Sequence, residues 1–231
     1  MPGPGGAKKT PWPWILGGCG GCLVLSIIGA VILGAIGYTT ARKVARETVK
    51  TIQLQEGMIN FTNELSNTPE SLKPHYSRFS FQYPAKFKII PDESNFIKVE
   101  EEEDGFTLEN FAVGYVAVTP GMSNEKAYPL LMQQLSQQIA QSFQNYRELG
   151  QFPDSVGGVP GYGMRWQATA PNTPKGDVQF FGRVILARKE NRPKGVAIIM
   201  IGTNLDPDVH SSGDVGLRGD LARILATFDL E

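Results

Sequence analysis

The stretch that decides the fold is Val196–Thr203, VAIIMIGT. It is almost continuously apolar, which is typical of a central strand covered on both faces of a sheet. Val178–Ala187 precedes it and also has strand character, and the polar segment Lys189–Gly195 between them predicts a hairpin connection. These two stretches therefore predict the centre of a β-sheet.

Further strands are predicted on both sides of this centre. Phe79, Phe81 and Tyr83 alternate with polar residues, which predicts a half-buried strand that ends at Pro84. Alternating or continuous apolar residues predict four more strands, at Phe87–Ile90, Asn95–Val99, Phe111–Val118 and Tyr162–Ala168.

Two segments have the period of a helix. Ser123 or Asn124 is a candidate cap for the first, whose opposite face is rich in glutamine and is expected to be solvated. The second covers about Asp214–Ala226. The two segments make the fold class α+β, an antiparallel β-sheet flanked by helices, over residues 72–231. The apolar positions of the first helix are Ala127, Leu131, Leu135, Ile139, Phe143 and Tyr146.

Four stretches of the chain resemble the PsbP/DcrB-like family. They are FSFQYPAKFKI (79–89), VGGVPGYGMRW (156–166), VAIIMIG (196–202) and RILATFDLE (223–231). The resemblance covers about residues 76–231 and implies an antiparallel sheet flanked by helices. Members include photosystem accessory proteins, bacterial periplasmic lipoproteins and a Ran-binding nuclear-import factor. The shared patterns are aromatic, glycine and strand patterns, so the resemblance assigns no binding residue.

A membrane helix is predicted near the amino terminus. Ile15–Gly37 is uncharged and apolar, and its 23 residues would form a helix of about 34 Å, which is long enough to cross a bilayer. We place this helix at residues 14–38, after a disordered tail (1–13) and before a helical stalk (39–71). The run exceeds the apolar core of a signal peptide, which favours a permanent signal-anchor over cleavage. Cys19 ends a lipobox-like tetrapeptide, but its apolar core follows the cysteine instead of preceding it.

The predicted membrane helix carries a stripe of small residues at four-residue spacing. Such a stripe lets two helices approach closely, so it predicts self-association in the bilayer. Cys19 and Cys22 also form a C-x-x-C pattern, but a thiolate at the edge of hydrocarbon is costly, which favours a packing role over redox chemistry. The residues of the stripe are Gly18, Cys22, Ser26, Ala30 and Gly34.

Charge is divided unevenly along the chain. The first 50 residues hold six basic residues and one acidic residue, so the totals of 22 and 23 leave 16 basic and 22 acidic residues after position 50. An acidic body argues against nucleic acid as a partner. We expect a single-pass membrane protein whose domain lies outside the cytoplasm and whose partner is another membrane or envelope protein. Basic residues flank the membrane segment on both sides, so they leave its orientation open.

No catalytic motif was found, and we expect no catalytic residues, no cofactor and no metal. The sequence has no nucleophile elbow, phosphate-binding loop or dinucleotide fingerprint. The function expected is therefore a non-catalytic binding or scaffolding module. Two alternatives remain. One is a structural membrane subunit that assembles through the Gly18–Gly34 stripe, and the other is a metal-dependent or enzymatic use of the 206–214 loop.

Two acidic clusters could bind a metal, although we favour a solvated turn for the first, and turn formers with a helix cap before the last helix for the second. The first is the run Glu100–Asp104, in which consecutive carboxylates could collect a hard cation such as calcium. The second lies in the loop before the last helix, where a histidine accompanies three carboxylates. Its residues are Asp206, Asp208, His210 and Asp214.

Overall fold

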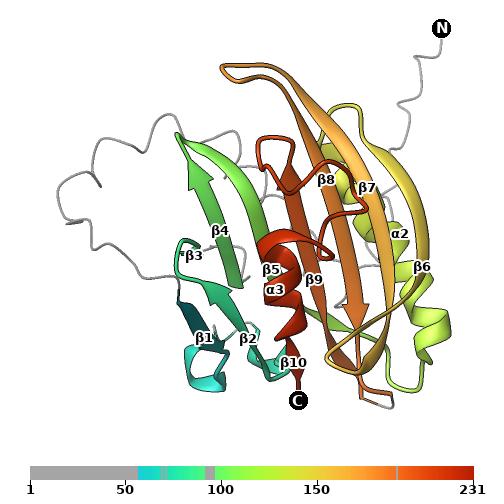
Figure 1. The fold of residues 1–231 in the computed structure, drawn as a ribbon. Helices are drawn as coiled ribbons and strands as arrows, with labels where there is room; N and C mark the ends of the chain where they lie inside the picture. Colours follow the sequence, from blue (N-terminus) through green and yellow to red (C-terminus); the bar gives the residue numbers. More distant parts are fainter. Residues whose placement is uncertain (1–56, 69, 71, 92–96, 191) are drawn as a thin grey trace, which may run out of the picture.

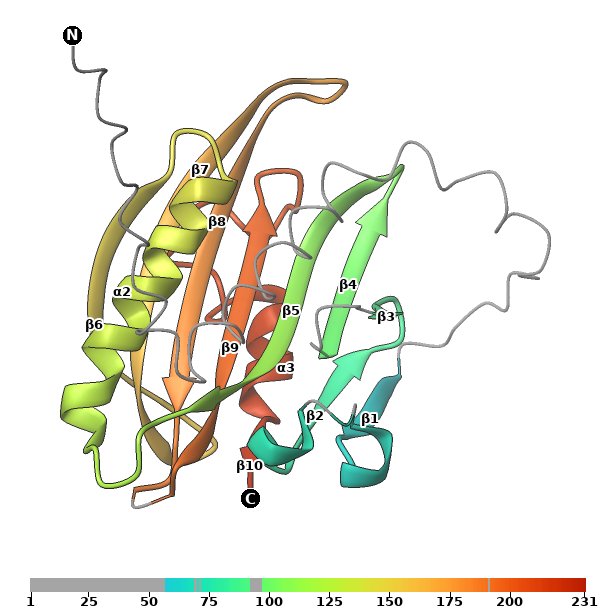
Figure 2. The same cartoon turned by 180° about the vertical axis from the view of Figure 1, so that it is seen from behind.

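A computed structural model describes residues 57–231 except 69, 71, 92–96 and 191. These residues form two antiparallel sheets. The larger has seven strands in the order β3-β4-β5-β9-β8-β7-β6, and the smaller has three in the order β1-β2-β10. Helix α2 covers one face of the large sheet, while α3 and the small sheet cover the other (Figures 1 and 2). The predicted antiparallel α+β architecture is confirmed.

The large sheet consists of β3 (Lys88–Pro91), β4 (Ile97–Glu103), β5 (Phe106–Ala117), β6 (Arg147–Val156), β7 (Val159–Thr173), β8 (Gly176–Ala187) and β9 (Lys194–Thr203). The small sheet consists of β1 (Met58–Thr62), β2 (Phe79–Pro84) and β10 (Asp229–Leu230). The helices are α2 (Asn124–Ser142) and α3 (Gly219–Ala226), with short 3-10 turns at Leu65–Asn67 and Lys73–His75.

Strand β9 is the central strand that its sequence predicts. It pairs with β5 on one side and β8 on the other, and its side chains alternate between two cores. Ile198 lies in the core beneath α3, and Ile199 lies in the core beneath α2. Both faces are therefore covered, which explains why the strand is apolar at nearly every position.

Aromatic rings join the small sheet to the large one. The Phe79 ring of β2 stacks on Phe228 with centroids 5.6 Å apart, and the Phe81 ring lies 5.2 Å from Phe111 of β5. Leu221 and Ile224 of α3 are fully buried in the same core. The period-two pattern of β2 thus supplies the aromatic half of this core.

Helix α2 ends earlier than predicted. It stops at Ser142, and the chain turns through Asn145, whose φ of 52° is left-handed and cannot continue a helix. Tyr146 keeps helical spacing in the sequence but lies outside the helix, and its ring reaches Trp166 at 5.9 Å. Apolar spacing alone could not separate a helical contact from one made just after the turn.

Three further predictions are corrected. Strand β6 was not predicted because it is an edge strand, mostly exposed, with little apolar alternation. Met58–Thr62 was expected to be helical, but it is strand β1, held by Phe61 against Phe81. The last helix starts at Gly219 instead of Asp214, because Gly216 has a positive φ of 70° and forms a turn that a helix cannot continue through.

The predicted membrane segment is not part of the described structure. In the ranges that the structure describes, no helix is long and apolar enough to cross a bilayer. The tail (1–13), the membrane helix (14–38) and residues 39–56 of the stalk lie outside the described residues.

Candidate functional site

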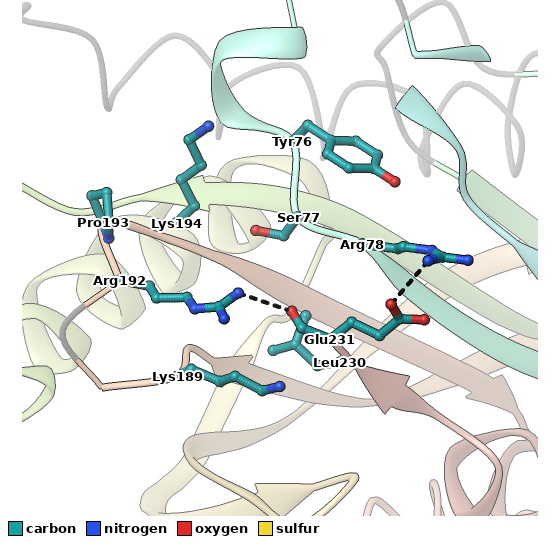
Figure 3. Close-up of a pocket in the computed structure, with 9 residues that line it drawn as sticks. All are labelled: Tyr76, Ser77, Arg78, Lys189, Arg192, Pro193, Lys194, Leu230 and Glu231. Carbon is teal, nitrogen blue, oxygen red and sulfur yellow. Dashed lines mark hydrogen bonds and ion pairs between the residues drawn. The ribbon is translucent and has the colours of Figure 1, made fainter. Parts of the chain in front are cut away.

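A basic hollow of about 510 Å³ opens where three distant segments of the chain meet. One segment precedes β2, one connects β8 to β9, and one is the carboxyl end around β10 (Figure 3). Its volume is that of a small-ligand site. The hollow is lined by Tyr76, Ser77, Arg78, Lys189, Arg192, Pro193, Lys194, Leu230 and Glu231.

Pairing of β10 with β2 brings the ends of the domain together at this hollow. Leu230 lies opposite Phe79, and the Glu231 amide donates a hydrogen bond of 3.0 Å to the Arg78 carbonyl. The pairing buries Leu230 in the core, so it forms the apolar floor of the hollow. Residues 78 and 231 therefore become neighbours through the sheet.

Asn63 holds the wall that carries Tyr76 and Ser77. Its buried amide nitrogen donates to the Ser77 carbonyl at 2.9 Å and to the Tyr115 hydroxyl at 2.8 Å, and its oxygen accepts from the Phe79 amide at 2.6 Å. Tyr76 in turn donates to the Asn63 carbonyl at 3.1 Å. Mainly because of burial, the pKa of the Tyr76 hydroxyl is raised, so this group stays a neutral donor.

Arg188 holds the opposite wall. The residue is 3% exposed, and its guanidinium donates to the Asn124 side chain at 2.6 Å, to the Arg192 carbonyl at 2.9 Å and to the Met122 carbonyl at 2.8 Å. These bonds tie the β8–β9 connection to the start of α2. Ser123 is at the cap position of that helix, but its hydroxyl makes no capping hydrogen bond. A buried arginine thus fixes the loop that presents Lys189 and Arg192.

The hollow has an excess of positive charge. Four cationic side chains line it with one carboxylate side chain, that of Glu231. Arg78 pairs with that carboxylate at 3.1 Å, and Arg192 donates to the main-chain oxygen of Glu231 at 3.4 Å (Figure 3). Across the described residues, Lys189 and Lys194 have no ion-pair partner. The arrangement suits an anionic group.

The sequence did not single out this site. Lys189–Gly195 was predicted only as a hairpin connection, and Arg78 belongs to no motif. The site combines residues more than 150 positions apart, and no spacing rule connects them. The available signal was the basic character of the 188–194 connection in an otherwise acidic body.

The 206–214 loop is a set of turns. The Asp206 carboxylate accepts from the Asp208 amide at 2.7 Å, and Asp214 accepts from the Ser211 hydroxyl at 2.8 Å and the His210 amide at 3.2 Å. The Ser211 hydrogen bond lowers the pKa of the Asp214 carboxyl. His210 is exposed, and in the part of the chain that is described it joins no metal-ligating group of three.

The Glu100–Asp104 run divides into three environments. Glu100 is buried and pairs with Lys98 at 3.1 Å, whereas Asp104 lies in the exposed turn and pairs with Lys175 at 3.0 Å. Glu101 is half-buried and points to the face beneath α3. The prediction of a solvated turn was therefore wrong for Glu100 and Glu101, the first part of the run.

The predicted helix-packing residues Gly18, Cys22, Ser26, Ala30 and Gly34 lie outside the described residues, as does Cys19. Their role stays a prediction.

No protein family and no curated protein match the sequence. Several solved structures are similar in fold. LpqN, involved in cell envelope biogenesis of Mycobacterium tuberculosis, has 7% identity and a TM-score of 0.45, with 75% of this chain and 91% of that chain covered. Cyanobacterial PsbP from Synechocystis has 9% identity and a TM-score of 0.47, with 80% and 99% covered. The Saccharomyces cerevisiae Ran-binding protein Mog1p has 14% identity and a TM-score of 0.37, with 63% and 78% covered.

Proposed function

We propose that this chain is a membrane-tethered, non-catalytic binding module of the PsbP/DcrB-like type. In this proposal the basic hollow binds an anionic group of another envelope protein. The observation that carries the proposal is the hollow itself, because four cationic side chains line it together with the apolar Leu230. A cationic recess of this size matches a carboxylate-bearing segment of a partner.

The tether in this proposal is supported by the amino-terminal sequence. Ile15–Gly37 has the length and hydropathy of a membrane helix, and aromatic residues flank it at Trp14 and Tyr38. A lone signal-anchor ahead of a large domain favours placing that domain outside the cytoplasm. The partner is then expected in the envelope or on the same membrane.

A metal-dependent or enzymatic use of the 206–214 loop is less well supported. Its carboxylates accept hydrogen bonds that form the turns, and His210 belongs to no group of three potential metal ligands among the described residues. The alternative of a structural subunit depends on the Gly18–Gly34 stripe. Replacing Ala30 and Gly34 by leucine should lower the mass of the detergent-solubilised assembly, and an unchanged mass would remove that alternative.

The binding proposal is tested by charge reversal in the full chain. Tagged protein isolated from native membranes in mild detergent should retain a partner, and Arg192→Glu with Lys194→Glu should abolish this retention. A matched control, Lys88→Glu with Arg147→Glu, changes two exposed cations outside the hollow. This control should retain the partner as the parent protein does. Equal retention by both double variants would contradict the proposal.

A further inference from the structure

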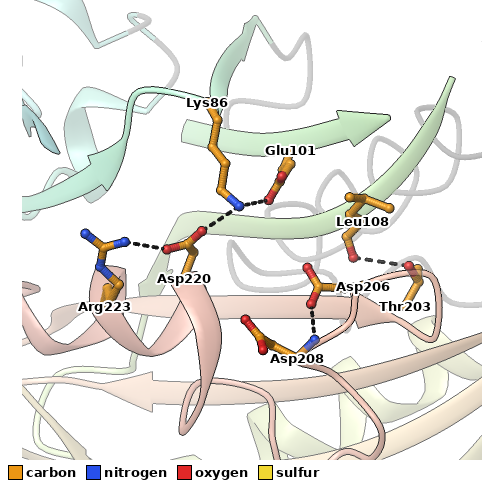
Figure 4. Close-up of polar contacts among 8 residues, drawn as sticks. All are labelled: Lys86, Glu101, Leu108, Thr203, Asp206, Asp208, Asp220 and Arg223. Carbon is orange, nitrogen blue, oxygen red and sulfur yellow. Dashed lines mark hydrogen bonds and ion pairs between the residues drawn. The ribbon is translucent and has the colours of Figure 1, made fainter. Parts of the chain in front are cut away.

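A second polar cluster lies between β4, β5 and the start of α3, and none of its members lines the hollow. It consists of Glu101, Glu109 and Asp220, whose nearest carboxylate oxygens all lie within 4.8 Å of one another. Figure 4 shows Glu101 of β4 and Asp220 of α3 pointing toward each other, with Asp206 beside them. These oxygens come from a strand, its neighbour and a helix, so the fold itself assembles the cluster.

Glu109 is the unusual member. It lies directly opposite Glu101 in the β4–β5 ladder, and two like charges in that position repel each other. Its side chain is 1% exposed, and its Oε1 atom has no hydrogen-bond partner among the described residues. A buried carboxylate without a partner is costly unless a proton or a cation accompanies it.

Neither cation at the cluster forms an ion pair with Glu109, although the Lys86 charge lowers the pKa of Glu109 in part. The Lys86 ammonium lies 2.9 Å from Glu101 Oε2 and 2.8 Å from Asp220 Oδ2, and Arg223 donates to Asp220 at 2.9 Å (Figure 4). Two cations therefore face three carboxylates, with Asp206 adding a fourth negative charge nearby. The cluster remains short of positive charge.

The electrostatics agree with this geometry. Burial, together with Asp206, Asp220 and Glu101, raises the pKa of Glu109 to about 8. Burial alone would lower the pKa of Lys86, but its hydrogen bonds to Asp220 and Glu101 raise it above the ordinary value. Both shifts favour the protonated forms, so at neutral pH Glu109 keeps its proton and Lys86 keeps its positive charge.

We propose that Glu101, Glu109 and Asp220 bind a divalent cation of the size of Ca²⁺, which replaces the Lys86 ammonium between the carboxylates. Three carboxylate oxygens that all lie within 4.8 Å of one another can share one Ca²⁺, whose bonds to oxygen are about 2.3–2.6 Å long. Mg²⁺ demands near-ideal octahedral geometry at about 2.0–2.1 Å, whereas Ca²⁺ accepts an irregular set of oxygens such as one fixed by two strands and a helix. Lys86 is half-exposed on a flexible stem and can swing into solvent.

Calorimetry on metal-free full chain in non-ionic detergent tests the site, with CaCl₂ as the titrant. We expect saturable binding in the parent protein and at least a tenfold weaker affinity in Glu109→Gln. The matched control Glu125→Gln changes an exposed carboxylate in the first turn of α2 and should bind as the parent does. Absence of calcium binding in the parent, or an unchanged affinity in Glu109→Gln, would overturn the proposal.

A second variant tests the exchange with Lys86. Lys86→Met removes the competing ammonium, so the calcium affinity should rise about tenfold, which corresponds to about 1.4 kcal/mol. An unchanged or lower affinity would contradict the replacement. A parallel titration with MgCl₂ should show weaker binding than CaCl₂, and equal affinity would overturn the assignment by size. Thermal unfolding in chelator confirms that each variant is folded.

Discussion

Gly182 and Trp166 face each other across β8 and β7 in the core beneath α2. A Cβ atom at Gly182 would lie 1.9 Å from Trp166 Cε2, closer than any side-chain contact allows. Trp166 is fully buried, so it cannot move aside without displacing Phe143 and Tyr146. Glycine at position 182 is therefore required by packing.

Gly182→Ala should lower the free energy of unfolding by about 1–3 kcal/mol, because the added methyl overpacks a closed core. Urea unfolding followed by Trp fluorescence measures the change. Gly213→Ala is the control, since a methyl there meets only the Ser211 hydroxyl at 3.1 Å. Equal stability of Gly182→Ala and the parent would show that the Trp166 ring has room to shift.

Glu109 gives the domain a pH dependence in the absence of divalent cations. Its folded-state pKa of about 8 exceeds the usual glutamate value of about 4.3, so between these pH values the folded chain holds a proton that the unfolded chain has lost. The free energy of unfolding should therefore fall as pH rises through this window, by up to about 1.4 kcal/mol per pH unit.

Glu109→Gln should flatten this slope and be the more stable protein at pH 8 in chelator. Urea unfolding midpoints at pH 5, 6, 7 and 8 in chelator measure this pH dependence. The control Glu125→Gln should follow the parent. Parallel curves for parent and Glu109→Gln would mean that Glu109 is already ionised in the folded chain at neutral pH.

At the scale of elements, the sequence predicts those whose pattern comes from burial on a regular period. Strand β9 and three of the buried positions of α2 (Ala127, Leu135 and Ile139) were predicted because covered faces demand apolar residues at fixed spacing, whereas the buried Tyr128 and Met132 were not. Edge strand β6 was missed because exposure removes that demand. Helix α3 is shorter than predicted because a turn at Gly216, which apolar counting ignores, precedes it.

The two sites escaped prediction for a topological reason. The hollow needs β10 beside β2, and the carboxylate cluster needs Glu101 opposite Glu109 beneath Asp220. Glu101 and Asp206 each lay in an acidic cluster of the sequence. Glu109, whose burial distinguishes the site, did not, because one glutamate in a strand has no recognisable pattern.

Asn63 links β1 to the wall of the hollow, so it should matter to both stability and binding. Asn63→Ala leaves the Phe79 amide and the Ser77 carbonyl without their side-chain partner, and unfolding should become easier by about 1–3 kcal/mol. Ser66→Ala, which removes only an exposed contact of 3.4 Å, should be neutral. Denaturant titration of both variants measures this, and similar midpoints would contradict the assigned role.

At the scale of the whole molecule, charge is segregated. The chain after residue 50 is acidic overall, yet one recess concentrates cations, while a cluster on other elements concentrates carboxylates. Opposite charges kept apart in this way favour two separate ligands. We therefore propose an anionic partner at the hollow and a cation at the start of α3.

The proposed tether predicts how the full chain fractionates. Because Ile15–Gly37 would span the bilayer, the chain should stay in the membrane pellet after alkaline carbonate extraction and be released by detergent. Deleting residues 1–38 should move it to the soluble fraction. A full chain that carbonate releases would contradict the anchor, while leaving the binding site of the domain untouched.

The central claim is that the basic hollow binds another protein, and photocrosslinking from Ser77 in living cells tests it most directly. A photoreactive residue there lies inside the hollow, whereas one at Gln141 lies on exposed α2 and serves as the control. The account predicts an adduct with a second protein from Ser77 alone, lost when Arg192 and Lys194 become glutamate. No adduct from Ser77, or one that survives the charge reversal, would contradict it.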